Sequence, residues 1–267
     1  SRTWIAQRPA KGSDDMIAGL PMYDRQELQT EQDLFWSKLR SNLGFGPESL
    51  TKPDNIVNFW QRSDLVFGQT CGMPYRTFLH DKVKLIGTPD YGIAGCPPGH
   101  YRSAVIVHRD SNLHQLGDLA NTTIAYNEPL SQSGWAAVVS EMEEAGLKPT
   151  AGLQTHDHAN SAIAVSTREA DFAAIDAHTW RLLLTYQTVL TNKLRVVHWT
   201  TPTPGLPFIC AERFDTDELF VAVQNTLGDM SRVDLNKLGL CGIVKIPKQH
   251  YLNILSPSSP CNLFGHA

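Results

Sequence analysis

The sequence lacks the features that mark several large classes of protein. No run of apolar residues in its 267 residues approaches the roughly 20 that an α-helix needs to cross a bilayer, so we expect no direct membrane insertion. Basic residues are not in excess, since 23 Lys and Arg stand against 27 Asp and Glu. Without a positive field, the phosphate backbone of a nucleic acid is not an expected partner, whereas a small anion remains possible.

Cysteines are also scarce. The chain contains five, an odd number, so at least one is unpaired within the chain: Cys71, Cys96, Cys210, Cys241 and Cys261. No two of them have the C-x-x-C spacing of a zinc site, and we expect them to act as small buried hydrophobic residues. His156 and His158 lie close together, but no further ligand residues are near them. We therefore predict no metal site and no cofactor.

An export signal is not visible at the start of the sequence, because residues 1–15 lack the apolar segment of a signal peptide. A secreted protein whose signal had been removed has the same appearance, and this alternative predicts a periplasmic protein. The other alternative takes Met16 as the natural start and predicts a cytoplasmic protein. The sequence does not decide between them.

What the sequence does contain is a regular alternation of helical and strand-like segments. With 42% hydrophobic content, the chain can bury one large core or two modest ones. Short β-branched and aromatic runs predict strands near residues 16–23, 57–67, 83–88, 101–107, 122–126, 171–175 and 194–199. Runs of helix formers predict helices near residues 28–43, 74–80, 135–145, 162–168 and 216–231. The alternation predicts an α/β fold of mostly parallel sheets flanked by helices.

The segment 126–135 combines a strand end, a polar turn and the start of a helix. Ser131 and Ser133 stand where the N-cap side chains of that helix belong, and Gly134 allows close approach to the backbone. The unpaired N–H groups of a first helical turn attract anions, so the turn from Asn127 to Gly134 is a candidate oxyanion cradle. The alternative is a capped helix that binds nothing.

Eight segments resemble a known family, in an order that extends over residues 16–255. They are LPMYD at 20–24, QTCGMPY at 69–75, GTPDY at 87–91, GCPPG at 95–99, SQSG at 131–134, His158 followed by Ala164 and Val165, ADFAAID at 170–176 and TPGLPF at 203–208. In this order they resemble the phosphate/phosphite/phosphonate-binding component of ABC importers.

The resemblance implies a type II periplasmic binding protein, in which two α/β lobes joined by two hinge crossovers close on a ligand between them. On this sequence, residues 1–104 and 200–267 would form the first lobe and residues 105–199 the second. The crossovers would lie near residues 103–108 and 196–201. The family also implies that the membrane subunits of an ABC transporter are partners, and we expect the protein itself to act as a monomer.

The resemblance further implies a ligand site with residues from both lobes. On the second lobe, the oxyanion would be held at the serine-rich helix start and by a nearby histidine, with contacts from Asn127, Ser131, Gln132, Ser133, Gly134 and His158. The opposite wall would consist of Tyr23, Gln69, Thr70, Tyr91 and Tyr101. Backbone N–H groups, hydroxyls and an imidazole supply donors from several directions, as a tetrahedral oxyanion requires.

Asp176 follows a buried strand and faces the cleft by position, so it is also a candidate ligand contact. A carboxylate beside an anion repels it unless the carboxylate is protonated, hydrogen-bonded to the anion, or paired with a cationic part of the ligand. Asp176 therefore indicates a zwitterion or a protonated oxyanion. Against the zwitterion, members of the family that take aminoalkylphosphonates have an acidic residue where this chain has Leu206, directly after Gly205.

The same fold also hosts enzymes, such as ones that make the thiamine pyrimidine or dehydrate a chorismate-like acid. Cys71 in a polar loop and His158 across the cleft suit a nucleophile and a base. Only Arg76 is near enough in sequence to lower the pKa of the thiol, so a thiolate is not evident. The sensing half of a DNA-binding regulator is a further alternative, but the chain has no DNA-binding helix pair. We therefore predict a binding protein that carries out no catalysis.

Overall fold

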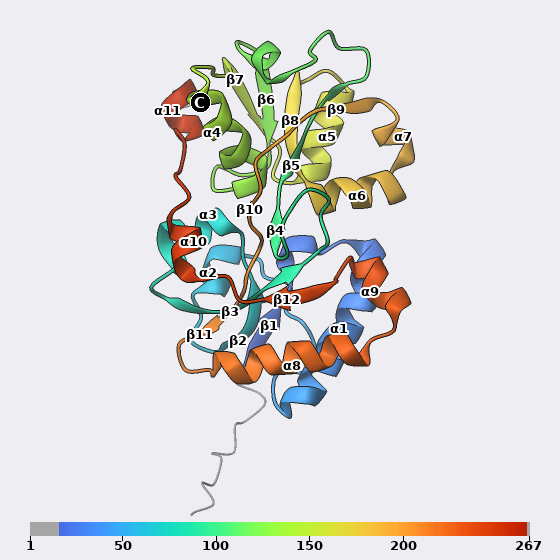
Figure 1. The fold of residues 1–267 in the computed structure, drawn as a ribbon, viewed down its shortest axis with the longest axis vertical. Coiled ribbons are helices and arrows are strands. Elements are labelled where there is room, and N and C mark those ends of the chain that lie inside the picture. Colours follow the sequence, from blue (N-terminus) through green and yellow to red (C-terminus); the bar gives the residue numbers. More distant parts are fainter. Residues whose placement is uncertain (1–15, 266–267) are drawn as a thin grey trace, which may run out of the picture.

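The protein consists of two α/β lobes, one above the other in Figure 1. The computed structural model describes residues 16–265. The sheet of the first lobe has the strand order β1-β2-β11-β3-β12 and contains β1 (Ile17–Gly19), β2 (Leu65–Gln69), β3 (Val83–Asp90), β11 (Phe208–Ala211) and β12 (Gly242–Val244). The sheet of the second lobe has the order β7-β6-β8-β5-β9 and contains β5 (Ser103–His108), β6 (Thr123–Tyr126), β7 (Ala151–Gln154), β8 (Phe172–Asp176) and β9 (Leu194–Trp199).

Strand pairing in both sheets is mixed, which refines the expectation of mostly parallel sheets. In the first sheet β1 and β2 pair in parallel, while β11 runs antiparallel to both β2 and β3, and β12 antiparallel to β3. In the second sheet β6 pairs in parallel with β7 and β8, while β5 runs antiparallel to β8 and β9. Both β5 and β11 are the first strands after the chain has passed from one lobe to the other. The first strand after each crossover, β5 or β11, is thus antiparallel to both of its neighbours.

Helices cover the sheets of both lobes (Figure 1). Those of the first lobe are α1 (Gln29–Leu43), α2 (Ile56–Trp60), α3 (Gly72–Pro74), α8 (Thr216–Asp229), α9 (Arg232–Leu238) and α10 (Lys248–Leu252). Those packed on the second sheet are α4 (Ala137–Glu144), α5 (His158–Ser166), α6 (Ala177–Tyr186), α7 (Thr188–Thr191) and α11 (Pro260–Phe264). Alternate residues of β5 enter two different cores, with Ile106 in the one beside α5 and Val107 in the one beside α4. This alternation follows from the period of two in a strand that is buried on both faces.

The two crossovers lie a few residues away from their expected positions. Residues 103–108 are β5, and residues 196–199 belong to β9. Val105 and Ile106 of β5 are fully buried in the core of the second lobe, so these segments are not crossovers. The chain crosses instead at β4 (His100–Tyr101) and β10 (Thr203–Pro204), which pair antiparallel between the lobes. Figure 1 shows this short ribbon in the middle of the molecule.

The last helix departs from the expectation that all of residues 200–267 belong to the first lobe. Leu263 and Phe264 of α11 pack against the core of the second sheet, and the Phe264 ring meets the Trp135 ring edge-on at 5.9 Å. The chain therefore returns to the second lobe at its end, since the apolar face of α11 finds its partners there. The lobe boundaries near residues 104 and 200 remain a prediction.

Two local expectations were wrong. Residues 56–60 form α2 rather than part of a strand, because the Asn55 side chain caps a helical turn by accepting from the Asn58 N–H at 2.9 Å. The five cysteines form no disulfide with one another, but only Cys210 is buried, while Cys241 and Cys261 are exposed. Within the part of the chain that the structure describes, no helix is both long and apolar enough to span a bilayer.

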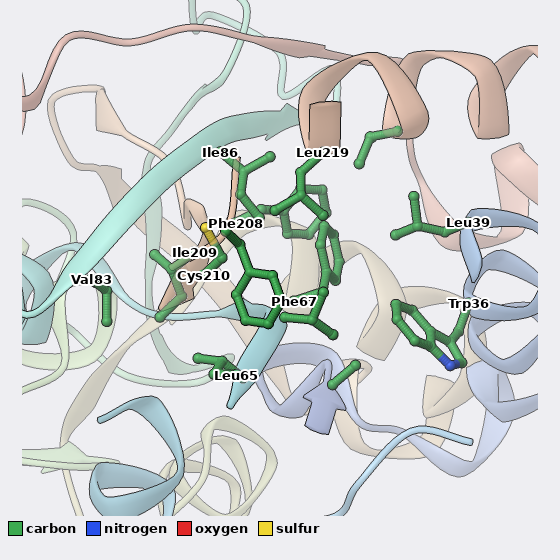
Figure 2. Packing of buried hydrophobic residues seen from close by; sticks show 14 of the residues in the cluster. Trp36, Leu39, Leu65, Phe67, Val83, Ile86, Phe208, Ile209, Cys210 and Leu219 are labelled. Carbon is green, nitrogen blue, oxygen red and sulfur yellow. The ribbon is translucent and has the colours of Figure 1, made fainter. Parts of the chain in front are cut away.

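Aromatic rings fill the core of the first lobe (Figure 2). The Phe67 ring of β2 lies 4.7 Å from the Phe208 ring of β11 and 6.2 Å from the Trp36 ring of α1. All three side chains are almost completely buried. The Phe67 ring therefore packs both within the sheet, against β11, and against the covering helix α1. This packing holds the end of β2 in place.

Replacing Phe67 by Ala should lower the free energy of unfolding by about 3 to 5 kcal/mol, because it removes buried apolar surface and leaves a cavity among rigid rings. Urea unfolding of Phe67→Ala and wild type measures the difference. The exposed Val233→Ala substitution in α9 is a control that should change stability by less than about 0.5 kcal/mol. A loss as small as that of the control would mean that this packing does not hold the end of β2 in place.

Candidate ligand-binding site

The predicted site residues meet between the lobes, mostly at strand ends. Gln69 is the last residue of β2, Asp176 is the last residue of β8, and Asn127 directly follows β6. Tyr23 ends a short 3₁₀ turn that follows β1. In open α/β sheets, ligands bind beyond the carboxyl ends of the strands, which is where these side chains are found.

Ser131 caps the helix start that the sequence predicted. Its hydroxyl oxygen accepts a hydrogen bond from the Gly134 N–H at 2.9 Å. The first turn, Gln132–Ala136, is a π-helical turn in which the Ala136 N–H bonds to the Ser131 carbonyl at 3.0 Å, and α4 follows directly. The Ser131 hydroxyl oxygen therefore accepts from the backbone, while its proton can still be donated to a ligand.

Ser133 is placed differently. Its hydroxyl lies 3.0 Å from His158 Nε2, and its carbonyl accepts from the Ser103 hydroxyl at 2.8 Å. Among residues 16–265, no hydrogen bond is formed by the Ser133 N–H. Ser133 thus holds one hydroxyl and one backbone donor at a helix start, where the helix dipole favours an anion.

Gly134 is required by a close approach of Asn127. A Cβ at Gly134 would lie 1.9 Å from Asn127 Oδ1, so no larger residue fits at that position. The Asn127 Oδ1 atom is buried, and within the described residues it has no hydrogen-bond partner. Asn127 is therefore held against the cradle with its amide oxygen still available for a donor.

Burial lowers the pKa of His158 below its ordinary value, although the charges of Asp176 and Asp157 oppose the shift. The imidazole is therefore neutral at neutral pH, and it can act towards the Ser133 hydroxyl either as donor or as acceptor. His158 begins α5, whose N-cap is Asp157. The cradle thus carries hydrogen-bond donors without a full positive charge on the histidine.

A hydrogen bond between the lobes joins Tyr23 to Asp176. The Tyr23 hydroxyl donates to Asp176 Oδ2 at 2.7 Å, while Asp176 Oδ1 accepts from the Thr179 N–H at 2.9 Å and so caps α6. Asp176 is only 2% exposed, and burial raises the pKa of its carboxyl group. Burial and the neighbouring Asp176 also raise the pKa of Tyr23, which remains a donor. The carboxyl group is therefore easier to protonate than one in water.

The remaining residues of the opposite wall make their hydrogen bonds within the first lobe. Gln69 Nε2 donates to the Tyr91 hydroxyl and to the Leu206 carbonyl, both at 3.2 Å. The Thr70 N–H bonds to the Pro207 carbonyl, and the Thr70 hydroxyl lies 3.4 Å from the Cys71 carbonyl. These bonds fix the wall but leave the predicted ligand contacts of Gln69, Thr70 and Tyr91 as predictions.

Leu206 and Tyr101 belong to an apolar cluster at the same wall. The cluster consists of Tyr23, Ile93, Tyr101, Ala177 and Leu206, and Leu206 is 5% exposed. The Tyr101 hydroxyl lies 4.0 Å from Cys71 Sγ, and burial raises the pKa of the tyrosine. This part of the wall can therefore face an apolar substituent of a ligand.

The structure separates the two residues of the enzyme alternative. Cys71 Sγ accepts from the Gln132 N–H at 3.3 Å, whereas His158 Nε2 faces Ser133. No hydrogen bond joins Cys71 to His158 in the described part of the chain, so a thiol activated by this histidine is not formed. No group of three or more His, Cys, Asp or Glu side chains among residues 16–265 is placed to hold a metal ion, and His156 Nδ1 lies 3.0 Å from Glu128 Oε1.

Sequence reasoning missed two buried residues beside the site. Arg76 was considered only as a neighbour of the Cys71 thiol, but its Nη1 donates to Gln132 Oε1 across the lobes at 2.5 Å. His178 stacks on Tyr91 at 4.5 Å and accepts from Arg181 Nη2 at 2.8 Å. The signal for Arg76 was a single basic residue in a short helix of otherwise apolar and small residues. No local pattern marks His178, because the rings packed against it, Tyr23 and Tyr91, come from the other lobe.

The fold and the interlobe site define a class of two-lobe substrate-binding proteins, and structures of such proteins resemble this one. PhnD1 of Prochlorococcus marinus (MIT 9301) in complex with methylphosphonate has a TM-score of 0.76 at 16% identity, covering 90% of this chain and 95% of that one. A binding component of an ABC phosphonate transporter from Pseudomonas aeruginosa has a TM-score of 0.65 at 16% identity, covering 93% and 82%. The periplasmic aliphatic sulphonate-binding protein SsuA of Escherichia coli has a TM-score of 0.56 at 16% identity, covering 91% and 84%.

At these identities, the structural similarity establishes the type II periplasmic-binding fold. The family follows from the sequence itself: residues 17–251 match the ABC transporter, phosphonate, periplasmic substrate-binding protein family, and the chain belongs to it. No curated protein matches the sequence. The resemblance inferred from the motif order is thereby confirmed, and the prediction that the chain is not an enzyme agrees with the family and its structural neighbours.

His178 gives a pH-dependent prediction. Burial, together with the charge of Arg181, lowers the pKa of His178 to about 3. Below the ordinary histidine pKa the unfolded chain takes up a proton that the folded protein does not, so stability is lost as pH falls. His178→Gln, which keeps an acceptor for Arg181, should remove about 2 kcal/mol of the stability loss between about pH 7 and about pH 5. Denaturant unfolding at each pH tests this.

The raised pKa of Asp176 acts with the opposite sign in the acid range, and both proteins share it. It therefore cancels in the comparison of wild type with His178→Gln. Parallel pH profiles for the two proteins would show that His178 is not buried in the neutral form.

Proposed function

We propose that this protein captures a small tetrahedral oxyanion of the phosphonate, phosphite or phosphate class between its lobes, for delivery to the membrane subunits of an ABC importer. The observation that carries the proposal is Ser133, whose hydroxyl meets a neutral His158 and whose N–H is unbonded at a helix start. Family membership and the fold of the phosphonate-binding neighbours support it. On this basis we also propose a periplasmic location.

The cradle has the chemistry that a reversible anion carrier needs. A tetrahedral oxyanion accepts hydrogen bonds from several directions, and Ser133, His158 and the backbone of the first turn can supply them. Helix-start donors carry partial charges, which hold an anion without the strength of a fully paired salt bridge. Release to a transporter is then possible once the lobes open.

Asp176 limits the charge of the ligand. It lies on the second lobe with a raised pKa, near His158 and in contact with Tyr23 of the opposite wall. An anion bound beside it raises the cost of ionising the carboxyl group still further. The complex therefore needs one proton, either on Asp176 or on the oxyanion. A monoanion such as singly protonated methylphosphonate meets this requirement.

Leu206 limits the substituent of the ligand. The buried Leu206 side chain, beside Ile93, offers no acceptor for an ammonium group as an acidic residue at that position would, and burying such a charge without a partner is costly. We therefore expect hydrogen or methyl on the phosphorus atom to be preferred over aminoethyl.

Calorimetric titration with phosphate, phosphite, methylphosphonate and aminoethylphosphonate tests the proposal. We expect methylphosphonate or phosphite to bind tightest, and the absence of heat from all four would refute the ligand class.

Ser133→Ala should weaken binding by about 1 to 3 kcal/mol with little effect on folding.

Ser131→Ala is the matched control, because its hydroxyl caps the same helix start. It should lower stability by about 1 kcal/mol. If Ser133→Ala changes only the melting temperature and leaves affinity intact, Ser133 is a structural residue and the cradle lies elsewhere.

The pH dependence of binding tests the role of Asp176. In wild type, affinity for methylphosphonate should fall as pH rises, because the proton that the complex needs becomes harder to supply. An asparagine at this position cannot ionise, so the affinity of Asp176→Asn should match wild type in acid and exceed it in alkali. The wild-type affinity should fall by up to about tenfold per pH unit more than the affinity of the variant. Titration calorimetry over a pH series measures both slopes. Coincident slopes would remove Asp176 from the site.

A further inference from the structure

Arg76 connects three parts of the chain that are far apart in sequence. It lies in the π-helical turn Tyr75–Leu79 of the first lobe and is only 8% exposed. Its Nη1 donates to Gln132 Oε1 in the cradle of the second lobe at 2.5 Å, and its Nε donates to Ser256 Oγ at 3.2 Å. One guanidinium therefore bonds both to the opposite lobe and to the C-terminal part of the chain.

The charge of Arg76 has no acidic partner. Within the described residues, Arg76 forms no ion pair, and its Nη2 atom is buried without a hydrogen-bond partner. Burial lowers the pKa of the guanidinium, but an arginine remains charged in proteins. Because a buried charge needs its hydrogen bonds, loss of the Gln132 contact in an open arrangement must be made up by water.

The segment that carries Ser256 is itself a third connection between the lobes. We call residues 253–259 the strap. At its start, α10 is fixed to the first lobe by Tyr251, whose hydroxyl donates to the Gly205 carbonyl at 3.0 Å. At its end, the Ser258 carbonyl accepts from Trp135 Nε1 at 3.0 Å, and α11 packs on the second lobe. Figure 1 shows the strap to one side of the β4 and β10 crossovers.

The strap and Arg76 meet the cradle at neighbouring positions. Trp135 directly follows Gly134, and Gln132 directly precedes Ser133. Gln132 is held through its side chain by Arg76 and through its N–H by Cys71 Sγ. The first lobe therefore binds the cradle at Gln132 and the strap binds it at Trp135, on either side of the residues proposed to hold the anion.

We propose that Arg76 is an interlobe clasp that stabilises the closed arrangement by binding Gln132 and the strap rather than the ligand. This inference rests on the proposed function and adds to it a residue that positions the cradle. An interaction present only in the closed form shifts the open–closed equilibrium. Because every ligand draws on the same closed population, the clasp changes the affinity for all of them by one common factor.

Arg76→Lys tests the clasp, since lysine keeps the charge but cannot bridge Gln132 and Ser256 as the planar guanidinium does. Affinities for phosphate, phosphite and methylphosphonate should all weaken by the same factor, on the order of tenfold, through faster dissociation. Ser256→Ala, which removes only the strap bond, should give a smaller common factor. Arg232→Lys, exposed in α9, is the matched control and should leave the affinities unchanged.

Two results would overturn the clasp. Unequal losses that grow with the charge of the ligand would show that Arg76 contacts the ligand directly. Unchanged affinities in both Arg76→Lys and Ser256→Ala would show that the bonds contribute nothing to closure. If Arg76→Lys does not fold, Ser256→Ala alone decides between these outcomes.

A failure of the proposed function can be told apart from a failure of the clasp. If wild type binds none of the anions, the clasp is tested without ligand, by distances between spin labels at Val189 in α7 and Val233 in α9, both exposed. Ketone-bearing amino acids should carry the labels, because Cys241 and Cys261 are exposed thiols. Arg76→Lys should reduce the closed population. Identical distance distributions in the two proteins would refute the clasp.

Discussion

The pairing of the two crossovers is the constraint on which the rest of the structure depends. β4 and β10 pair with each other, and next to them the Thr200 N–H bonds to the Ser103 carbonyl while the Ser103 N–H bonds to Thr200 Oγ1. Two strands tied together at one place allow the lobes to turn about a short hinge but not to slide apart. The turn after β1 and the carboxyl end of β8 are thereby kept opposite each other, so that Tyr23 and Asp176 can meet.

Burial shifts the pKa values of four ionisable side chains at the site between the lobes towards their neutral forms. Burial lowers the pKa of His158 and raises the pKa values of Asp176, Tyr23 and Tyr101. Arg76 remains the buried cation beside the cradle. In surroundings of low polarity, one added or removed charge has a larger effect than in water. A ligand that differs from its competitor by a single proton can therefore be distinguished here, although the two have nearly the same shape.

Much of the fold could be predicted from local patterns, while the parts that depend on distant partners could not. Strands ending at Tyr126 and Trp199 were placed within a residue or so, because their β-branched runs and turn signals are local. β11 was missed, since Phe208–Ala211 is short and becomes a strand only by inserting between β2 and β3. The same holds for the site. The serine cradle has a local signature, but the roles of Arg76 and His178 depend on contacts between the lobes.

Ser131 and Ser133 show why a motif can locate a site without assigning its residues. The two serines are separated by one position and the sequence treats them alike, yet the helix geometry points them to different partners. Ser131 closes the cap on Gly134, and a π-helical first turn places Ser133 against His158. A cap hydroxyl already accepts a hydrogen bond from a backbone N–H. A hydroxyl that faces a neutral imidazole can instead act towards a ligand as donor or acceptor. Two positions in the chain thus give the two hydroxyls different partners, Gly134 for Ser131 and His158 for Ser133.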